Sequence, residues 1–363
     1  MMTALSVIGI LVLLIVVHEL GHFFVAKLFR VRVEEFGIGY PPRAFTLGKI
    51  GGTEYTLNWI PFGGFVRLFG DIGEKQHGRG SFVDAHRGVQ AAILVAGVFM
   101  NVVMAWVLFA TALHLGVPRV VDAPSLGQPV HLMVTHVVPS SPAAAAGLQS
   151  GDQITEVLGV NGEKPESLLP SAVVDFVKER GGKPISITYV HAGTTQTATI
   201  VPANAVLLNA AGQPALGIAL ALVANVSLPW GEAAIGALDQ TKQTFFMVLN
   251  DLWRLIRGAS TGGLDISEVV GPVGIVSYVG QASQNGIGAV LLLAAVISIN
   301  LAIINLIPIP ALDGGRLAVL AIESVLRRDA PRIALQLFNA AGIALIIVLM
   351  VVVTYNDIAR LIV

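Results

Sequence analysis

Four long apolar stretches constrain the fold of this chain more than any other feature of its sequence. A helix that crosses a lipid bilayer needs about 20 mostly apolar residues. Each of the four stretches is long enough, and they occupy residues 1–26, 88–117, 269–315 and 333–356. The pattern predicts a polytopic α-helical membrane protein with four transmembrane helices that contact the lipid bilayer.

The amino-acid composition favours a membrane protein over a soluble one. Of the 363 residues, 54% are hydrophobic and only 12% are charged, whereas soluble domains carry about 25% charged residues. The formal net charge of −1 provides no basic field, so we predict no nucleic-acid partner. The absence of cysteine excludes disulfides, thiolate nucleophiles and Cys-ligated metal sites.

The first apolar stretch resembles a signal peptide in its position alone. It lacks a basic start and a small-residue cleavage site, and it continues through His18–His22. We therefore predict that it remains in the protein as a transmembrane helix.

The distribution of Lys and Arg predicts the orientation in the membrane. The segment 27–87 holds nine of these residues and the short segment 316–332 holds four, whereas 116–287 holds eight over a much greater length. Basic residues are enriched in cytoplasmic loops. We therefore expect 27–87 and 316–332 in the cytoplasm, and the long segment and both termini outside it.

A candidate metal-binding motif lies within the first apolar stretch. His18 and His22 are four residues apart, so they share one face of a helix, and Glu19 lies between them. Two imidazoles at this spacing can bind one Zn²⁺ while the glutamate acts on water. Chance occurrence and a packed polar cluster are the alternatives. Ionisable groups at membrane depth are costly and by default mark a functional site, which favours the metal site.

A third ligand is expected, because catalytic zinc usually has three protein ligands. Asp313 is the one acid suitably placed in another apolar region, within the segment 305–315. Pro308 and Pro310 break the helix there, and the paired glycines after the aspartate let the backbone turn. The alternative is an ordinary helix end that Asp313 caps.

These two motifs carry a family resemblance. A His-Glu-x-x-His in the first span and an Asn-x-x-Pro-x-Pro-x-Leu-Asp-Gly near the end of a later span resemble the site-2 protease family of intramembrane zinc metalloproteases. The resemblance covers nearly the whole chain. It implies that His18, His22 and Asp313 ligate one Zn²⁺ per chain and that Glu19 is the catalytic acid/base. It also implies that Asn305 contacts substrate or the oxyanion.

The resemblance implies partners and a location as well. The substrates would be single-span transmembrane proteins, such as clipped anti-sigma factors or signal-peptide remnants. The expected location is the bacterial cytoplasmic (inner) membrane. Family members often have His after the paired glycines, where this chain has Arg316. That position is outside the implied ligand set.

The segment 128–223 reads as a soluble α+β domain inserted between spans. Its Ser-Pro-Ala…Ala-Gly-Leu…Gly-Asp-x-Ile string, at 141–154, resembles a PDZ domain of the bacterial protease type. By that resemblance, Leu216, Gly217 and Ile218 would form the peptide-binding loop and an edge strand. A generic small α+β domain is the alternative. The sigma-E-regulating proteases of Gram-negative bacteria have two such units, so this chain resembles a single-PDZ member of that branch.

Two further segments have recognisable patterns. Residues 224–268 carry apolar residues at helical spacing, which predicts an amphipathic helix on the membrane surface, a lid, or a linker helix packed on the PDZ-like domain. The cytoplasmic segment 27–87 has β character and contains Gly63 and Gly64. It resembles the membrane-associated β-hairpin of the family, which pairs with unwound substrate. The alternative is a hairpin packed on the protein itself.

The sequence thus predicts a zinc endopeptidase that acts within the bilayer. The rival hypothesis is a non-enzymatic membrane receptor that presents a PDZ-like domain and carries a degenerate metal site.

Overall fold

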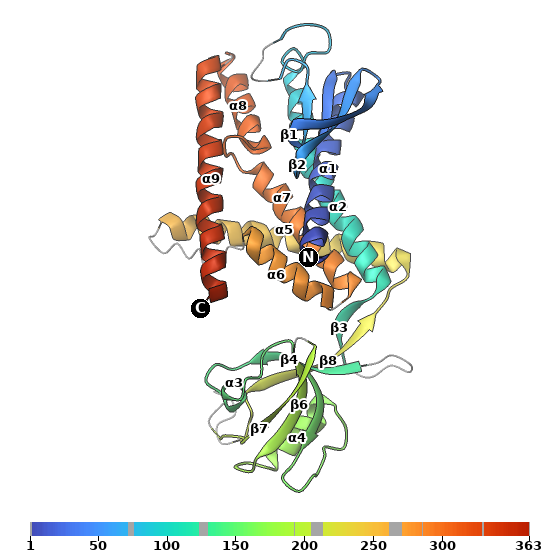
Figure 1. Cartoon of the computed structure of the whole chain (residues 1–363), viewed down its shortest axis with the longest axis vertical. Helices are drawn as coiled ribbons and strands as arrows, with labels where there is room; N and C mark the ends of the chain where they lie inside the picture. Colours follow the sequence, from blue (N-terminus) through green and yellow to red (C-terminus); the bar gives the residue numbers. More distant parts are fainter. Residues whose placement is uncertain are drawn as a thin grey trace. The chain divides into compact units, whose positions relative to one another are not determined.

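The computed structural model describes residues 2–71, 76–122, 130–191, 193–204, 213–260, 271–284, 286–328 and 330–362. The chain divides into two compact units (Figure 1). The first comprises Met1–Ala112 and Pro229–Val363, and the second comprises Leu113–Leu228. Residues 128–129 and 261–268, which fall within two of the expected domains, lie outside the described residues.

The helices of the first unit account for most of the apolar sequence. They are α1 (Met2–Leu28), α2 (Arg87–Leu115), α5 (Trp230–Ser260), α6 (Pro272–Gln284), α7 (Ile287–Leu306), α8 (Asp313–Leu326) and α9 (Arg332–Ile362). Among the described residues, four helices are long and apolar enough to cross a membrane, namely α1, α2, α7 and α9. The length and composition of these helices confirm the prediction of a polytopic membrane protein.

Glycine allows α1 and α2 to pack backbone against backbone. A Cβ atom at Gly21 would collide with the carbonyl oxygen of Ala96 and would lie 3.0 Å from the Cα of Gly97. Small residues at such a contact let apolar helices approach closely. This contact brings the middle of α2 against the turn of α1 that carries the two histidines.

The third apolar region differs from the single span expected over 269–315. It contains α6, a break at Gly286 and then α7, followed by an irregular turn and the start of α8. Gly286 has a φ of +94°, which a glycine adopts without strain and which interrupts the helix. The expected loop 316–332 is also corrected, because most of it belongs to the amphipathic helix α8, which buries Leu320 and Glu323.

The C-terminal part of α9 binds the start of α6. The two carboxylate oxygens of Asp357 accept hydrogen bonds from the backbone N–H groups of Gly271 (3.1 Å) and Gly274 (2.8 Å). A Cβ atom at Gly271 would lie only 2.6 Å from both Asp357 and Val353. The Gly271-Pro-Val-Gly string therefore provides the N–H groups and the space for a capping carboxylate from another helix.

The long helix α5 covers the outside of the helical unit. Its buried residues Ala233, Ala237 and Thr241 follow one face, and the indole N–H of Trp106 on α2 donates to the carbonyl of Ala234 (2.9 Å). The helix also packs against α7. One face of α5 is therefore packed within the helical unit.

The first unit also contains a β-hairpin. Strands β1 (Val33–Ile50) and β2 (Thr53–Leu68) are antiparallel, and both bend so strongly that one segment of β1 pairs on both sides. Phe36, for example, lies opposite both Val66 and Tyr55. The end of β2, residues 64–68, consequently forms an outer edge of this small sheet.

A buried carboxylate stabilises the hairpin. Glu35 is 3% exposed. It accepts hydrogen bonds from Thr56 (2.8 Å) and Arg43 (2.9 Å) and pairs with Arg67 (3.0 Å). A buried carboxylate with partners on both strands fixes their register, because losing one partner would leave the charge uncompensated.

The second unit is a small α+β domain. Its elements are β3 (Val117–Val121), β4 (Val130–Val137), α3 (Pro142–Ala145), β5 (Gln153–Leu158), α4 (Pro170–Lys178), β6 (Ile185–His191), β7 (Thr194–Ile200) and β8 (Ile218–Val226). The six strands form one sheet in the order β3-β8-β4-β5-β6-β7. Alternate strand residues such as Val134, Ile154 and Ile187 point into a core that α4 covers with Val173 and Phe176.

Ile218 begins β8, whose first residues, 218–221, pair on one side with β4. β8 lies between β4 and β3, and β3 pairs with its residues 222–226. Among the described residues, only 218–221 remain outside that second ladder. Leu216 is 3% exposed and belongs to the core, so its side chain does not line a surface site.

Candidate metal centre

Three side chains converge where α1 meets α8. The Nε2 atom of His18 lies 2.9 Å from Oδ2 of Asp313, the Nε2 atom of His22 lies 3.2 Å from the same oxygen, and the two Nε2 atoms are 3.1 Å apart. Both histidines are buried, with 7% and 8% of their surface exposed. The structure therefore brings these three predicted residues together.

Local chain structure explains the convergence. His18 and His22 are one helical turn apart on α1. Asp313 is the first residue of α8, immediately after the proline-broken turn that follows α7. A Cβ atom at Gly314 or Gly315 would collide with backbone carbonyls of 306–309, so only glycine permits this tight return.

The donor set fits a metal ion. Ligand atoms about 2 Å from one tetrahedral zinc lie about 3.3 Å from one another, and the three observed separations are close to this value. Two imidazoles and one carboxylate are also a combination that catalytic zinc sites use. The geometry can therefore hold one ion between His18, His22 and Asp313.

The second ring nitrogen of His22 has its own partner. Its Nδ1 atom lies 2.7 Å from the backbone carbonyl of Ile93 on α2. A carbonyl only accepts, so Nδ1 carries the proton and donates it. The Nε2 lone pair is thereby directed toward the cluster, as metal-binding histidines require.

Asn101 on α2 contacts the second ring nitrogen of His18, as Ile93 does for His22. Its Nδ2 atom lies 3.3 Å from Nδ1 of His18, and its backbone carbonyl accepts a hydrogen bond from Ser298 on α7 (2.8 Å). Among the described residues, its Oδ1 atom is the buried side-chain polar atom without a partner. If the amide is rotated by half a turn, Oδ1 accepts from a protonated Nδ1 of His18, which leaves Nε2 free for a metal. The unpartnered oxygen therefore fits a metal-bound His18.

Gly97 on α2 packs against the imidazole rings of both histidines. A Cβ atom at this position would lie 2.7 Å from two ring atoms of His18 and would collide with Nε2 of His22. Even alanine is excluded there, and the imidazoles pack directly on the backbone of α2. Neither Gly97 nor Asn101 was among the predicted site residues. The signal available in the sequence was a polar Asn101 in an otherwise apolar span.

Glu19 faces the β-hairpin. A Cβ atom at Gly64 would lie 3.4 Å from Cγ of Glu19, so the outer edge of β2 passes directly beside this carboxylate. Gly63 has a φ of +122° and packs on the ring of Tyr40. Burial and then the negative charge of Glu19 raise the pKa of the Tyr40 phenol. The structure thus brings the predicted residues Gly63 and Gly64 to the site.

The other predicted residues lie apart from the cluster. Asn305 is in the last turn of α7 and partly buried, and among the described residues no hydrogen bond joins it to the histidines or to Asp313. Leu216, Gly217 and Ile218 belong to the second unit. In that unit, the carbonyls of Leu216 and Gly217 accept from Ala143 and Val138.

Comparison with known proteins agrees with the geometry. The sequence pattern of peptidase family M50 matches residues 6–349. A candidate zinc metalloprotease of Clostridium perfringens (strain 13 / Type A) is 35% identical over 350 residues, which cover 95% of each chain. The zinc metalloprotease RasP of Oceanobacillus iheyensis is 28% identical over 442 aligned positions, which cover 99% of this chain and all of that protein.

Two solved PDZ domains are similar to part of this chain. The PDZ domain of an SdrC-like protein from Listeria monocytogenes is 28% identical and aligns with 28% of this chain and 93% of its own, at a TM-score of 0.21. A corresponding domain from Listeria innocua is 27% identical, with a TM-score of 0.20.

The matched residues include the histidine motif on α1 and the aspartate motif that ends in the first turn of α8, and these two motifs meet in space. The chain belongs to peptidase family M50.

Proposed function

We propose that this protein is an intramembrane zinc endopeptidase that cleaves single-span membrane proteins within or near the bilayer. The observation that carries the proposal is the cluster of His18, His22 and Asp313. Two of these ligands lie on a candidate membrane span, and the buried cluster is surrounded by apolar helices. An ionisable cluster in such surroundings is rarely structural.

In this proposal His18, His22 and Asp313 hold one Zn²⁺. When bound there, zinc polarises the scissile carbonyl and lowers the pKa of water toward about 7. Glu19 takes a proton from the attacking water and passes it to the leaving amine. The products are one new carboxylate and one new amine, so atoms and charge balance. Asn305 is assigned to contacts with the substrate or the developing oxyanion.

Substrate must present its backbone to this site in an extended form. A transmembrane helix hides its carbonyls in its own hydrogen bonds, so it has to unwind before cleavage. The edge at Gly63 and Gly64 offers replacement partners, because a free strand edge pairs with an added strand. The contact between Gly64 and Glu19 supports this assignment, since a strand added there would lie beside the proposed base.

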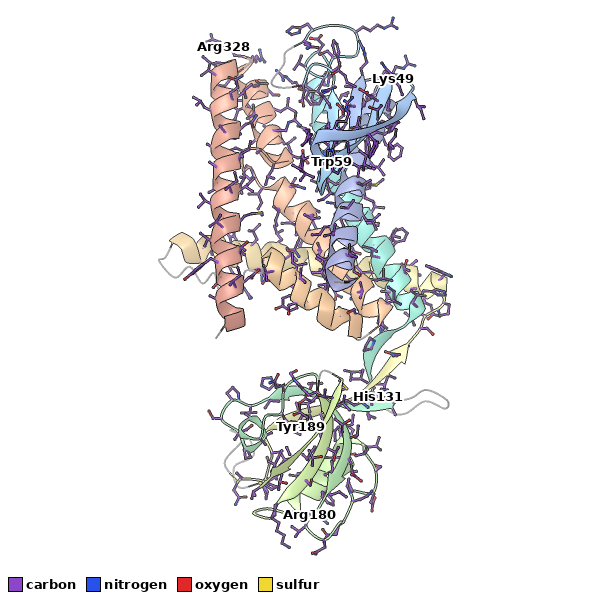
Figure 2. The ribbon with its side chains drawn as sticks, in the orientation of Figure 1. Lys49, Trp59, His131, Arg180, Tyr189 and Arg328 are labelled. Atoms are coloured by element: carbon purple, nitrogen blue, oxygen red, sulfur yellow. The ribbon has the colours of Figure 1, made fainter. Side chains whose placement is uncertain are left out.

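The hairpin also has the surface expected of a membrane-associated element. Trp59 is 68% exposed, and Figure 2 places it on the hairpin. Phe45, Leu47 and Ile50 on β1 are exposed to a similar degree. Large apolar side chains on one small sheet are typical of a surface that contacts lipid or a partner.

We assign the second unit to the PDZ type and place it, with both termini, outside the cytoplasm. Its order of strands and helices supports the assignment, and Gly217 has the positive φ of +82° that a tight loop before β8 requires. The excess of Lys and Arg in 27–87 supports the orientation. The substrates would be clipped anti-sigma factors or signal-peptide remnants in the bacterial inner membrane.

Zinc content and cleavage, measured on the same purified sample, test the proposal. The full chain in detergent should contain one zinc per molecule by elemental analysis. It should cut a tagged transmembrane reporter, lose this activity with a chelator and regain it with Zn²⁺. A folded protein that binds one zinc but cuts no transmembrane reporter would contradict the proposal.

A further inference from the structure

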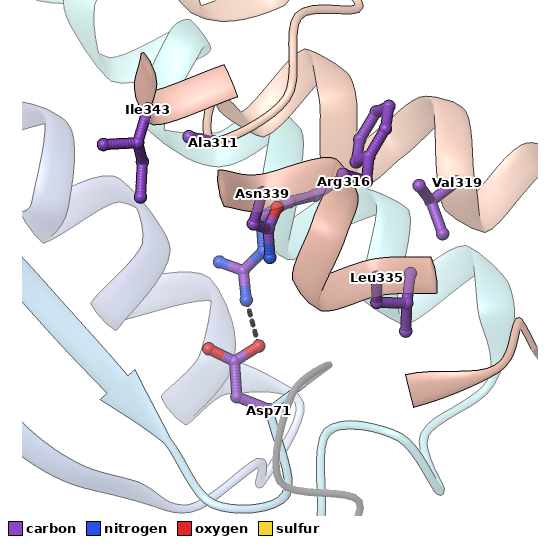
Figure 3. A pocket seen from close by; sticks show the side chains of 8 residues that line it. Asp71, Ala311, Arg316, Val319, Leu335, Asn339 and Ile343 are labelled. Atoms are coloured by element: carbon purple, nitrogen blue, oxygen red, sulfur yellow. Dashed lines mark hydrogen bonds and ion pairs between the residues drawn. The ribbon is translucent and has the colours of Figure 1, made fainter. Parts of the chain in front are cut away.

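A second feature involves Arg316, which lies one helical turn after Asp313 on α8. A partly open cavity of about 330 Å³ lies between α8, α9 and Asp71, which comes three residues after the end of β2 (Figure 3). Apolar side chains of Val319, Leu335 and Phe338 line most of it. Arg316 and Asn339 provide its polar groups, together with Asp71.

Arg316 is the cation of this cavity. It follows Asp313 by three residues, so the two side chains lie about one turn apart on α8. Its Nη2 atom donates to the carboxylate of Asp71, and Figure 3 shows the guanidinium between Asp71 and Asn339. A guanidinium has five N–H donors in a planar fork, so one bond to Asp71 leaves donors for a second carboxylate.

The proposed reaction generates a ligand of this chemistry. Hydrolysis adds the water oxygen to the carbonyl carbon, breaks the C–N bond and moves a proton to the nitrogen. One fragment leaves as an amine and the other ends in a new carboxylate. Because the cut lies in an apolar segment, that carboxylate follows apolar side chains.

We propose that this cavity binds the newly formed C-terminal carboxylate of the cleaved fragment, with Arg316 as its receptor and the apolar walls contacting the last side chains. The inference rests on the proposed function and adds a product subsite to it. Asn339 supplies an amide that can donate to the same carboxylate. Asp71 competes for Arg316, so the fragment is held loosely enough to leave.

Two substitutions should therefore act in opposite directions. Arg316→Gln removes the charge-assisted hydrogen bonds and should abolish the preference for a carboxylate. Asp71→Asn removes the competing negative charge and should strengthen that preference. Arg328→Gln is the matched control, because Arg328 is an exposed arginine that follows α8 and lies outside the cavity lining.

The test measures peptide binding to the full chain in detergent after zinc has been removed with a chelator. Metal removal matters, because a peptide carboxylate could otherwise bind zinc itself. The probes are two fluorescent, N-acetylated apolar hexapeptides of one sequence, one ending in a free acid and one in an amide. Fluorescence anisotropy should show the acid binding about tenfold tighter than the amide. The difference should vanish in Arg316→Gln, grow in Asp71→Asn and persist in Arg328→Gln.

Equal binding of acid and amide by the wild-type chain would overturn the inference, whatever the variants do. A preference that survives Arg316→Gln would overturn it as well. Cleavage of the transmembrane reporter by the zinc-loaded sample keeps the two proposals apart. Cleavage without any acid preference rejects the product subsite alone, whereas an acid preference without cleavage rejects the peptidase assignment.

Discussion

Glu19 is the residue on which the chemistry depends most directly. It lies between the two histidines and beside the strand edge at Gly64, where an extended peptide would pass. We expect Glu19→Gln to bind zinc normally and to lose cleavage by roughly 10²- to 10⁴-fold, because the amide keeps the shape but cannot take a proton. Cleavage of a tagged transmembrane reporter measures the loss, and elemental analysis measures zinc. Glu232→Gln on α5 is the control, and substantial proteolysis by Glu19→Gln would refute its role as base.

The ligand assignment makes a separate prediction. His22→Ala or Asp313→Ala should each bring bound zinc well below one per chain, because two remaining ligands form a weak site. Asp251→Ala, an exposed acid on α5, should leave the zinc content unchanged. If Asp313→Ala retained full zinc stoichiometry, the third ligand would have to be another residue.

Asn101 should matter through His18. Asn101→Leu preserves size but removes the acceptor for Nδ1, and we expect zinc affinity or activity to fall by roughly 10- to 100-fold. Asn101→Asp keeps an acceptor and should retain zinc better than leucine does. A competition titration with a zinc chelator compares the variants. Equal affinity of the leucine variant and the wild type would show that the amide does not orient His18.

At this scale the sequence was informative where residue types form a pattern. The two histidines, Glu19 and Asp313 stand out because ionisable residues are rare in apolar stretches. Gly97 did not stand out, because glycine is ordinary in a membrane helix, and the uncharged Asn101 gave a weaker signal than the ionisable residues. Their roles follow from the packing of α2 on α1, which no local pattern specifies.

At the scale of elements, the outer edge of β2 is the feature to test. Gly64→Val would place side-chain atoms where Cγ of Glu19 and the carbonyl of Gly37 already lie within about 3.4 Å. We expect cleavage to be largely lost while zinc content is kept, because the change blocks the strand edge and spares the ligands. Thr46→Val at an exposed position on β1 is the control. Full activity of Gly64→Val would exclude strand addition at this edge.

Secondary-structure elements could be predicted where the sequence of the element has one dominant pattern, such as a long uncharged apolar stretch. Apolar length identified α1, α2, α7 and α9. The division of 269–315 was missed because α6 and α7 are both uncharged and their separation depends on the backbone angle of Gly286. The segment 316–332 was predicted to be a loop from its four basic residues, of which only Arg316 lies within the amphipathic helix α8. The pairing of β3 with β8 is long-range and leaves no local signal.

At the scale of the whole molecule, the second unit raises the question of substrate choice. A substrate with an intact ectodomain is too bulky to approach a buried metal, so we expect the PDZ-type unit to act as a size filter. Deletion of residues 128–223 should allow cleavage of uncut substrate in a reconstituted assay. If the deletion variant cuts clipped substrate but still refuses the intact form, the filter hypothesis is wrong.

A carboxyl-terminus reader is the competing role for the same unit, and it would depend on the loop at Gly217. Gly217→Trp should abolish cleavage of clipped substrate only if reading is required. Gly193→Trp is the matched control, since Gly193 has a similar φ of +81° and open space around it. Under the filter hypothesis, both tryptophan variants keep their activity on clipped substrate.

The distance along the chain between the two halves of the metal cluster has a consequence for biosynthesis. His18 and Asp313 are 295 residues apart. During synthesis the first histidines enter the membrane long before their carboxylate partner has been translated. A nascent chain can therefore hold only the two-histidine half of the site, and Asp357 on α9 has yet to cap α6. The order of translation thus keeps an unfinished protease inactive beside the newly inserted membrane proteins around it.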